Sequence, residues 1–416
     1  MNTNDGLTSL ISNMGNPGKD KSASTAYTSL RLTDDQLIAA YSSSWIARKL
    51  VNLPANDMIR KWRTWAGDNP AVIEAEEKRL KIRSKVLECK IKSRLFGGAA
   101  IFIGTGQDLT QPLNINAIGT AGIKYLTVLD RRELTAGEIV TDPLSEYHNK
   151  PAYYTVSGTS SMGNIHPSHF VVMRGNESMD IAINDGWGVS ILQSAMSAAK
   201  NADSTAGNIA SLIFEANVDV IGIPDLTANL SSGGASFERN LLNRFALFSA
   251  GKGISGTGIL DKEEEYSRKT TSFAQLPDLL EAFLMIAGAT EGIPATRFMG
   301  SPPKGMSSTG EGDMKTYYDE IQSKQNNELM DEIDVLDRAL QQSAGAQGSY
   351  TWNPLQQMSE NEEAEIVKLT AEGLSIINDL GVFGSTEMRE IAKQQLTALG
   401  INTDVLGDEF MGDIDE

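Results

Sequence analysis

The sequence is short of the residues that most often cross-link a chain or carry out chemistry. Its 416 residues include one cysteine, Cys89, and three histidines, His148, His166 and His169. A single cysteine excludes a disulfide within the chain and is typical of a protein that folds in a reducing compartment. We interpret Cys89, which lies in the stretch LECKI, as a packed helical residue rather than a nucleophile.

Long apolar runs are also missing. The longest, at 279–289, is interrupted by Glu281 and falls well short of the roughly 18 residues that a membrane-spanning helix needs. The first ten residues, MNTNDGLTSL, have neither a basic start nor an apolar run, so we expect no secretory leader. The sequence therefore predicts no association with a membrane.

Positive charge is scarce and unevenly distributed. The chain has 36 Lys and Arg against 54 Asp and Glu, a net charge of −18 at pH 7. Residues 48–94 hold 13 basic and 6 acidic side chains, whereas residues 359–416 hold 3 and 14. An acidic protein is a poor sequence-independent DNA binder, because such affinity comes mainly from neutralised phosphates. In the basic stretch, glutamates at helical spacing favour a solvated helix face over a DNA contact.

Two glycine-rich stretches look like nucleotide-binding loops but lack what such loops require. In GSPPKGMSS (300–308), Lys304 precedes the last glycine, whereas the lysine of a P-loop follows it. Pro302 and Pro303 also remove two of the backbone amides that would bind phosphate. The stretch 251–256 matches G-x-G-x-x-G, but no apolar-periodic helix follows it, so we interpret it as a flexible hairpin.

The histidines leave an enzymatic alternative open. A phosphodiesterase that uses two histidines needs two H-x-[ST] motifs, and only His166-Pro-Ser fits. His166 and His169 could be part of a zinc site only if carboxylates elsewhere completed it. We interpret all three histidines as surface residues at strand edges. No catalytic residue, cofactor or metal ligand is predicted.

Apolar periodicity predicts an α+β fold, with helices followed by short strands and then more helices. Pro54 is expected to end or kink the first helix, which starts at Asp34, and a second short helix to carry Met58, Trp62 and Trp65. Strands are predicted at 97–104, 123–130, 152–157 and 169–175. Further helices are predicted at 70–95, 188–217, 236–244, 274–292, 311–342, from about 360, and 386–399.

Four stretches resemble the portal proteins of tailed bacteriophages, most closely a phage-associated group long described only as a domain of unknown function. They are YSSSWIARKLVNLPANDMIRKWRTW (41–65), GWGVSILQSAM (186–196), GIPATRFMGSPPKGMSSTGEGDMKTYYDEIQSKQ (292–325) and PLQQMSENEEAEI (354–366). Their order matches as well, so the resemblance covers roughly residues 34–400. It implies a non-enzymatic ring, usually of twelve subunits, at one capsid vertex, with a central channel for DNA.

The resemblance also divides the chain into the parts of a portal. The N-terminal residues 1–33 are rich in Ser, Thr, Asn and Gly without periodicity, which predicts a flexible arm. The resemblance implies a wing (34–187, and 311–358 with a long helix and a strand), two stem helices (188–213 and 271–292), a small mixed clip (214–270), a tunnel loop (293–310) and a short helical crown with an acidic tail (359–416). An acidic channel wall would repel phosphate and let DNA slide past.

Candidate contacts and partners follow from the same resemblance. The implied channel residues are Arg297, Ser301, Pro302, Pro303, Lys304, Gly305 and Met306, and the implied clip contacts are Phe237, Arg239, Arg244 and Lys252. The implied partners are other copies of the chain, double-stranded DNA, the terminase large subunit, a head–tail adaptor, and the major capsid and scaffolding proteins. The ring would belong to the virion and assemble in the bacterial cytoplasm. The alternatives are a phage-encoded phosphodiesterase or nucleotide-dependent protein, and another head–tail connector component.

Overall fold

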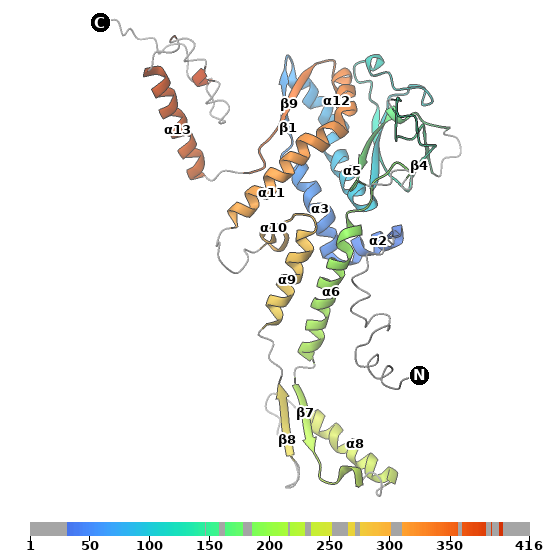
Figure 1. Ribbon diagram of the computed structural model, residues 1–416, viewed down its shortest axis with the longest axis vertical. Coiled ribbons are helices and arrows are strands. Elements are labelled where there is room, and N and C mark those ends of the chain that lie inside the picture. Colours follow the sequence, from blue (N-terminus) through green and yellow to red (C-terminus); the bar gives the residue numbers. More distant parts are fainter. Residues whose placement is uncertain are drawn as a thin grey trace, which may run out of the picture. The chain divides into compact units, whose positions relative to one another are not determined.

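The computed structural model describes residues 31–393 apart from 146, 158–162, 178–184, 215–216, 229–233, 252–264, 271–274, 301–309, 357–359, 380–383 and 385–390. The chain divides into two compact units, Met1–Thr351 and Trp352–Glu416. Helices and short antiparallel strands alternate along it (Figure 1), which confirms the predicted α+β class.

The first two helices, α2 (Asp34–Ser43) and α3 (Trp45–Arg60), are separated by one residue, Ser44. Thr33 begins α2 with a capping box: its hydroxyl accepts from the Gln36 N–H, and the Gln36 side chain accepts from the Thr33 N–H. Ser44 then ends α2 and caps the first turn of α3.

Pro54 lies inside α3, so the helix does not end at this residue as one form of the prediction had it. The buried face of α3 packs well enough to outweigh the hydrogen bond that proline removes. Trp62 and Trp65 lie beyond the helix, and Trp65 belongs to strand β1 (Arg63–Gly67). β1 pairs with β9 (Gly348–Trp352), a strand from far along the chain that local periodicity does not reveal.

The helix predicted over 70–95 is two helices, α4 (Pro70–Leu80) and α5 (Ile82–Phe96). Lys81 between them adopts the left-handed conformation, with φ of 54°. This turn lets each helix bury its own apolar stripe. Cys89 on α5 is fully buried, which confirms its reading as a packing residue.

Strand β2 (Gly98–Gly104) is the centre of an antiparallel sheet with the order β3-β2-β6. β3 (Tyr125–Asp130) and β6 (Phe170–Arg174) flank it, and Ile101 pairs with Val128 on one side and Val171 on the other. Every residue of β2 is buried, as its continuous apolar stretch predicts.

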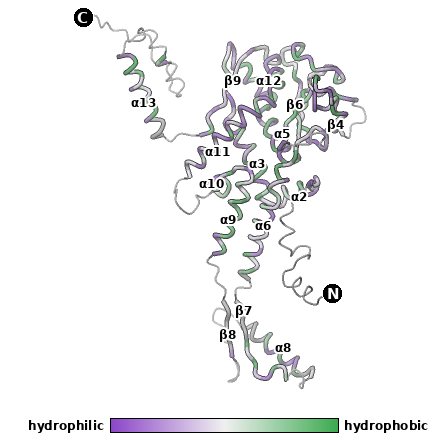
Figure 2. Tube along the Cα trace, in the orientation of Figure 1, coloured by the Kyte–Doolittle hydropathy of each residue, from purple (hydrophilic) through white to green (hydrophobic). Residues whose placement is uncertain are grey.

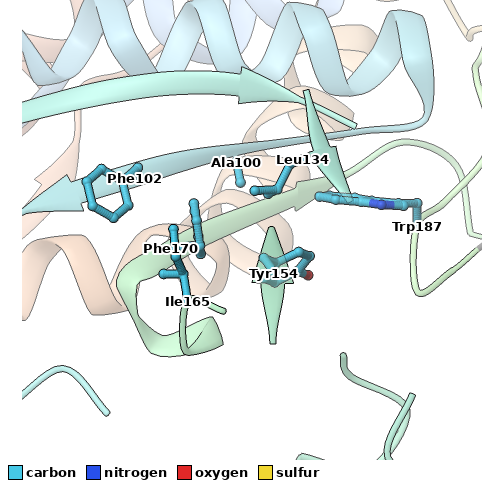
Figure 3. Close-up of a cluster of buried hydrophobic side chains, with 7 residues drawn as sticks. All are labelled: Ala100, Phe102, Leu134, Tyr154, Ile165, Phe170 and Trp187. Carbon is cyan, nitrogen blue, oxygen red and sulfur yellow. The ribbon is translucent and has the colours of Figure 1, made fainter. Parts of the chain in front are cut away.

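One hydrophobic cluster packs around this sheet and the small β4–β5 pair (Leu134–Ala136 and Tyr154–Val156). Figure 3 shows its members, which are Ala100, Phe102, Leu134, Tyr154, Ile165, Phe170 and Trp187. The Trp187 ring covers Gly98 so closely that a Cβ there would lie 2.2 Å from Trp187 Cε3. Only glycine therefore fits at the start of β2.

Helices α6 (Leu192–Phe214) and α9 (Leu276–Ala289) lie side by side (Figure 1). The chain between them contains an antiparallel pair, β7 (Asn217–Gly222) with β8 (Glu265–Thr270), and helix α8 (Gly234–Gly251). The three helices are confirmed, although α8 is longer than expected. The glycine stretch read as a hairpin lies almost wholly outside the described residues.

After the short helix α10 (Ala295–Met299), the helix predicted at 311–342 is present as α11 (Glu311–Lys324) and α12 (Met330–Ala344). They are joined by one π-helical turn, Gln325–Leu329, which no pattern in the sequence suggests. Gln325 is fully buried there and donates from Nε2 to the Met58 carbonyl at 2.5 Å. The widened turn thus fixes this helix to α3.

The second unit contains helix α13 (Glu360–Asp379), which confirms the helix expected near 360. The predicted capping residue Ser359 and most of the helix expected at 386–399 lie outside the described part of the chain. Within the described part, no helix combines the length and apolarity required to cross a bilayer.

Candidate functional site

Two helices flank residues 301–309, which hold all but one of the residues predicted to face DNA; α10 itself lies within the predicted tunnel loop, 293–310. α10 ends at Gly300, with φ of 80°, and α11 follows Gly310, with φ of 62°. Both are left-handed conformations that favour glycine. The described chain stops between them, so Ser301, Pro302, Pro303, Lys304, Gly305 and Met306 lie outside it. Their contact with DNA stays a prediction.

One buried carboxylate on α3, Asp57, binds both of these helices. Arg297 of α10 donates from Nε to Asp57 Oδ2 at 3.0 Å and from Nη2 to Oδ1 at 2.8 Å. Tyr317 of α11 donates its hydroxyl to the same Oδ2 at 2.9 Å. The Asp57 side chain is 0% exposed. We call Asp57, Arg297 and Tyr317 the Asp57 clasp.

The electrostatics of the clasp favour a protonated tyrosine and a charged arginine. Hydrogen bonding to Asp57 raises the pKa of Arg297. Burial, reinforced by the Asp57 charge, raises the pKa of Tyr317 far above its usual value, so its hydroxyl remains a donor. Arg60 also approaches Asp57, at 3.7 Å, and lies over the Tyr318 ring.

Arg297 is the one predicted channel residue in the described chain, and its guanidinium is already paired. Its side chain is 31% exposed, so part of it still faces solvent. A DNA phosphate would have to share this guanidinium with Asp57. The predicted contact of Arg297 with DNA therefore stays a prediction, beside an observed structural role.

Two further contacts hold α10 in place. Lys49 of α3 donates from Nζ to the Phe298 carbonyl at 2.6 Å and lies over the Trp45 and Phe298 rings. The Phe298 side chain is fully buried. At the start of α11, a Cβ on Gly310 would lie 2.6 Å from Thr296 Cγ2, so the two helices touch at this point.

A cavity of about 650 Å³ is lined by residues of α5, β6 and α12, among other elements. Its lining includes four basic and four acidic side chains: Lys90, Arg94, Arg174, Lys324, Glu177, Glu291, Glu328 and Glu332. Lys90 pairs with Glu332 at 2.8 Å, and Arg94 pairs with Glu291 at 2.7 Å. Burial raises the pKa of Glu332. The balanced charge favours neither an anionic nor a cationic ligand, and these pairs join α5 to α12 and to the end of α9.

The clip residues predicted to meet partners lie on α8. Arg239 and Arg244 are exposed and Phe237 is half-buried, whereas Lys252 lies outside the described residues. Among the described residues, β7 and β8 pair only with each other, so the outer edge of each strand is one that other strands could extend. Contact with a partner at this place stays a prediction.

Apolar side chains are exposed along the packed pair α6 and α9. Leu279, Met285 and Ile286 of α9 are 48%, 39% and 55% exposed, and Leu212 of α6 is 40% exposed. Figure 2 shows hydrophobic residues along both helices. A helix that is apolar on its outward face favours a further protein surface against it.

The reading of the histidines as surface residues is wrong for one of them. His169 is fully buried at the end of the 3-10 turn Pro167–His169, directly before β6. Its ring stacks on Phe102, and its Nε2 hydrogen-bonds the Gln111 carbonyl at 3.0 Å. His148 is exposed and His166 is half-buried, with Nδ1 at 2.8 Å from Ser168 Oγ. No group of three His, Cys, Asp or Glu in the described chain could hold a metal ion.

Sequence reasoning missed Asp57 and Tyr317. One signal was available for Asp57, because it follows Leu50 by seven residues and so lies on the buried stripe of its helix. A carboxylate at such a position needs a buried partner. The identity of that partner is not readable from the sequence, since Arg297 lies 240 residues away.

The chain matches a family model described as phage portal protein over residues 35–376. It is also similar to two curated proteins, each named anti-CBASS protein Acb1. The one from Caulobacter sp. (strain RHG1) is 39% identical over 89% of this chain, and the one from Sphingomonas paeninsulae is 36% identical over 95%. This chain spans only 62% and 66% of their respective lengths.

A solved structure shares the fold. It is a chain in the neck of a native gene transfer agent (GTA) particle, computed with C12 symmetry, with a TM-score of 0.54. The alignment covers 95% of this chain and 99% of that one, at 13% sequence identity. At this identity the likeness concerns the fold alone.

Proposed function

Because the chain belongs to the phage portal protein family and has the portal fold, we propose that it forms a homo-oligomeric ring at one vertex of the capsid of a tailed phage. Double-stranded DNA enters through the channel of this ring during packaging and leaves through it during ejection. The C12 symmetry of the neck that contains the structural neighbour supports a dodecamer.

The observation that carries the ring is the apolar surface of α9. Leu279, Met285 and Ile286 are exposed although α9 already packs against α6 of its own chain. Burying apolar area stabilises by about 25 cal/mol per Å², so a neighbouring copy that covers this face gains association energy. In the ring, each pair of stem helices contacts the pair of the next subunit.

The remaining parts take the roles that the family suggests. Residues 34–187 and 311–358 are the wing, 188–213 and 271–292 the stem, and 359–416 the crown. The clip, 214–270, docks the terminase large subunit and later the head–tail adaptor, and Arg239 and Arg244 are exposed on it. Major capsid and scaffolding proteins contact the ring during assembly in the host cytoplasm, and the ring stays in the virion.

Imaging of the purified protein tests the ring. Negative stain should show rings with a central hole wide enough for duplex DNA. Ile286→Glu places a charge on the proposed contact and should abolish the rings, whereas Leu144→Glu, at a residue that is 94% exposed, should leave them intact. A wild-type protein that stays monomeric at every concentration contradicts the proposal.

The tunnel loop, 293–310, contacts DNA in this proposal, with Lys304 steadying the duplex. Lys304→Glu should leave ring assembly intact and lower DNA packaging or retention. Lys78→Glu, at an exposed residue of α4, is the matched control and should have no effect. Failure of Lys304→Glu to form rings would make the loop an assembly element, and normal rings with normal packaging would contradict its contact with DNA.

The name of the two curated relatives suggests a second candidate function, an anti-CBASS activity. Since the chain spans 62% and 66% of their lengths, we propose that the anti-CBASS activity in that name belongs to the part of them that this chain does not span. The chain itself is then not an enzyme and uses no cofactor. Turnover of cyclic oligonucleotides or ATP by the purified protein, lost in His166→Ala, would instead support the enzymatic alternative.

A further inference from the structure

We propose that Asp57 is a positioning residue: this one buried carboxylate holds α10 against α11 and thereby sets where Gly300 and Gly310, the two ends of the predicted DNA-facing segment, lie. The role in DNA passage rests on the proposed function of that segment. The role in holding the two helices does not.

The first argument is the way in which Arg297 and Tyr317 share the two carboxylate oxygens of Asp57. Arg297 takes both in a fork, at 2.8 and 3.0 Å, while Tyr317 shares Oδ2 at 2.9 Å. Hydrogen bonds to a charged acceptor are stronger than neutral ones, and a fork also defines an orientation. One carboxylate therefore determines the direction of α10 and the depth of the first turns of α11.

The second argument is that Asp57 is held firmly by α3, whereas α10, which it binds, is not stable by itself. Asp57 lies between the buried residues Pro54 and Met58 on a helix of 16 residues. α10 has five residues, which is far below the length at which a helix is stable alone. Its position therefore depends on side-chain contacts, and the Arg297 fork is the contact in which both partners are charged.

The third argument is that the other contacts of α10 converge on the same place. The Lys49 ammonium binds the Phe298 carbonyl from α3, and Thr296 lies against Gly310. The chain thus leaves the junction at Gly300 and returns to it at Gly310 under the control of α3. Weakening Asp57 should loosen both ends together.

Hydrogen exchange of the purified full-length protein tests this position directly, without DNA. Asp57→Asn keeps the shape and one acceptor oxygen but loses the charge and half of the fork. The amides of Arg297, Phe298, Gly300 and Met314, which donate to backbone carbonyls in these helices, should exchange about tenfold faster or more, the factor carried by one charge-assisted hydrogen bond.

Two further variants keep the test decisive. Tyr317→Phe removes one hydroxyl and should give a smaller rise in the same amides, even if the asparagine variant fails to fold. Asp334→Asn removes a carboxylate that is 58% exposed and paired with Arg338, and should change nothing at these amides. Unchanged exchange in both clasp variants overturns the proposal.

DNA packaging by particles that carry each variant separates the two parts of the proposal, which are the role of Asp57 in holding the helices and its role in DNA passage. Faster exchange and reduced packaging in Asp57→Asn support it. Faster exchange with normal packaging overturns the link to DNA if Lys304→Glu still lowers packaging. If Lys304→Glu is also without effect, the clasp stands as a structural element and the proposed function of the segment is refuted.

Discussion

Replacing Arg63 by methionine should destabilise the first unit of the chain more than the replacement of any ordinary surface arginine. The Arg63 side chain is 0% exposed and sits between two carboxylates. It donates from Nη2 to Glu77 at 2.9 Å and from Nη1 to Asp337 at 2.6 Å. Its guanidinium also lies over the rings of Trp65 and Tyr350, at 4.7 and 4.3 Å.

The expected magnitude follows from what the substitution leaves behind. Methionine fills much of the volume but leaves Glu77 and Asp337 buried without their cation. Breaking a buried ion pair from one side costs about 3–5 kcal/mol of folding free energy. Arg338→Met is the matched control, because Arg338 and its partner Asp334 are 56% and 58% exposed, and such a surface pair contributes about 0–1 kcal/mol.

Denaturant unfolding followed by tryptophan fluorescence measures the difference, since Trp62 and Trp65 lie against Arg63 and report on this cluster. Far-ultraviolet circular dichroism checks that the helices unfold in the same transition. If Arg63→Met unfolds within about 1 kcal/mol of wild type, the guanidinium is not what keeps these carboxylates buried, and the reasoning is refuted.

The stability lost in Arg63→Met should also depend on pH, which gives a second test of this prediction. Burial raises the pKa of Asp337, so the folded protein holds a proton there more readily than the unfolded chain does. A raised folded pKa contributes stability below the unfolded pKa, and this contribution is lost as pH rises through the folded pKa. Without Arg63 the pKa of Asp337 rises further. The difference in stability between wild type and Arg63→Met should therefore narrow as the pH falls and Asp337 takes up its proton.

Three shorter predictions concern the core. Phe298→Ala should lower the free energy of unfolding by about 3–5 kcal/mol in denaturant titrations, because it empties a fully buried site, and a loss below about 1 kcal/mol would contradict the packing. Gly98→Ala should cost about 1–3 kcal/mol in the same assay, since its Cβ would meet the Trp187 ring, and no change would show that the ring can move. Cys89 should resist thiol reagents in the native protein and react after denaturation, because it is fully buried and burial raises the pKa of its thiol; fast native labelling would contradict this.

Local pattern was a reliable guide where the burial of an element follows directly from its run or spacing of apolar residues. The apolar stretch GGAAIFIG predicts a buried strand, and β2 is one. The helices α6, α9 and α13 follow from periodicity in the same way. The errors came where tertiary packing outweighs a local preference: Pro54 is held inside α3, Lys81 divides one expected helix into two, and Trp65 joins a strand whose partner, β9, begins at Gly348.

The sequence by itself determined the class of the protein. Four stretches in order indicated the family that the family model confirms. Such conclusions need only the identity and spacing of residues. Only the tertiary structure decided what Arg297 does. Its guanidinium pairs with the carboxylate of Asp57, 240 residues earlier in the chain, and the Tyr317 hydroxyl donates to the same Oδ2 atom of Asp57. A buried ion pair depends on distance in space, which sequence separation does not encode.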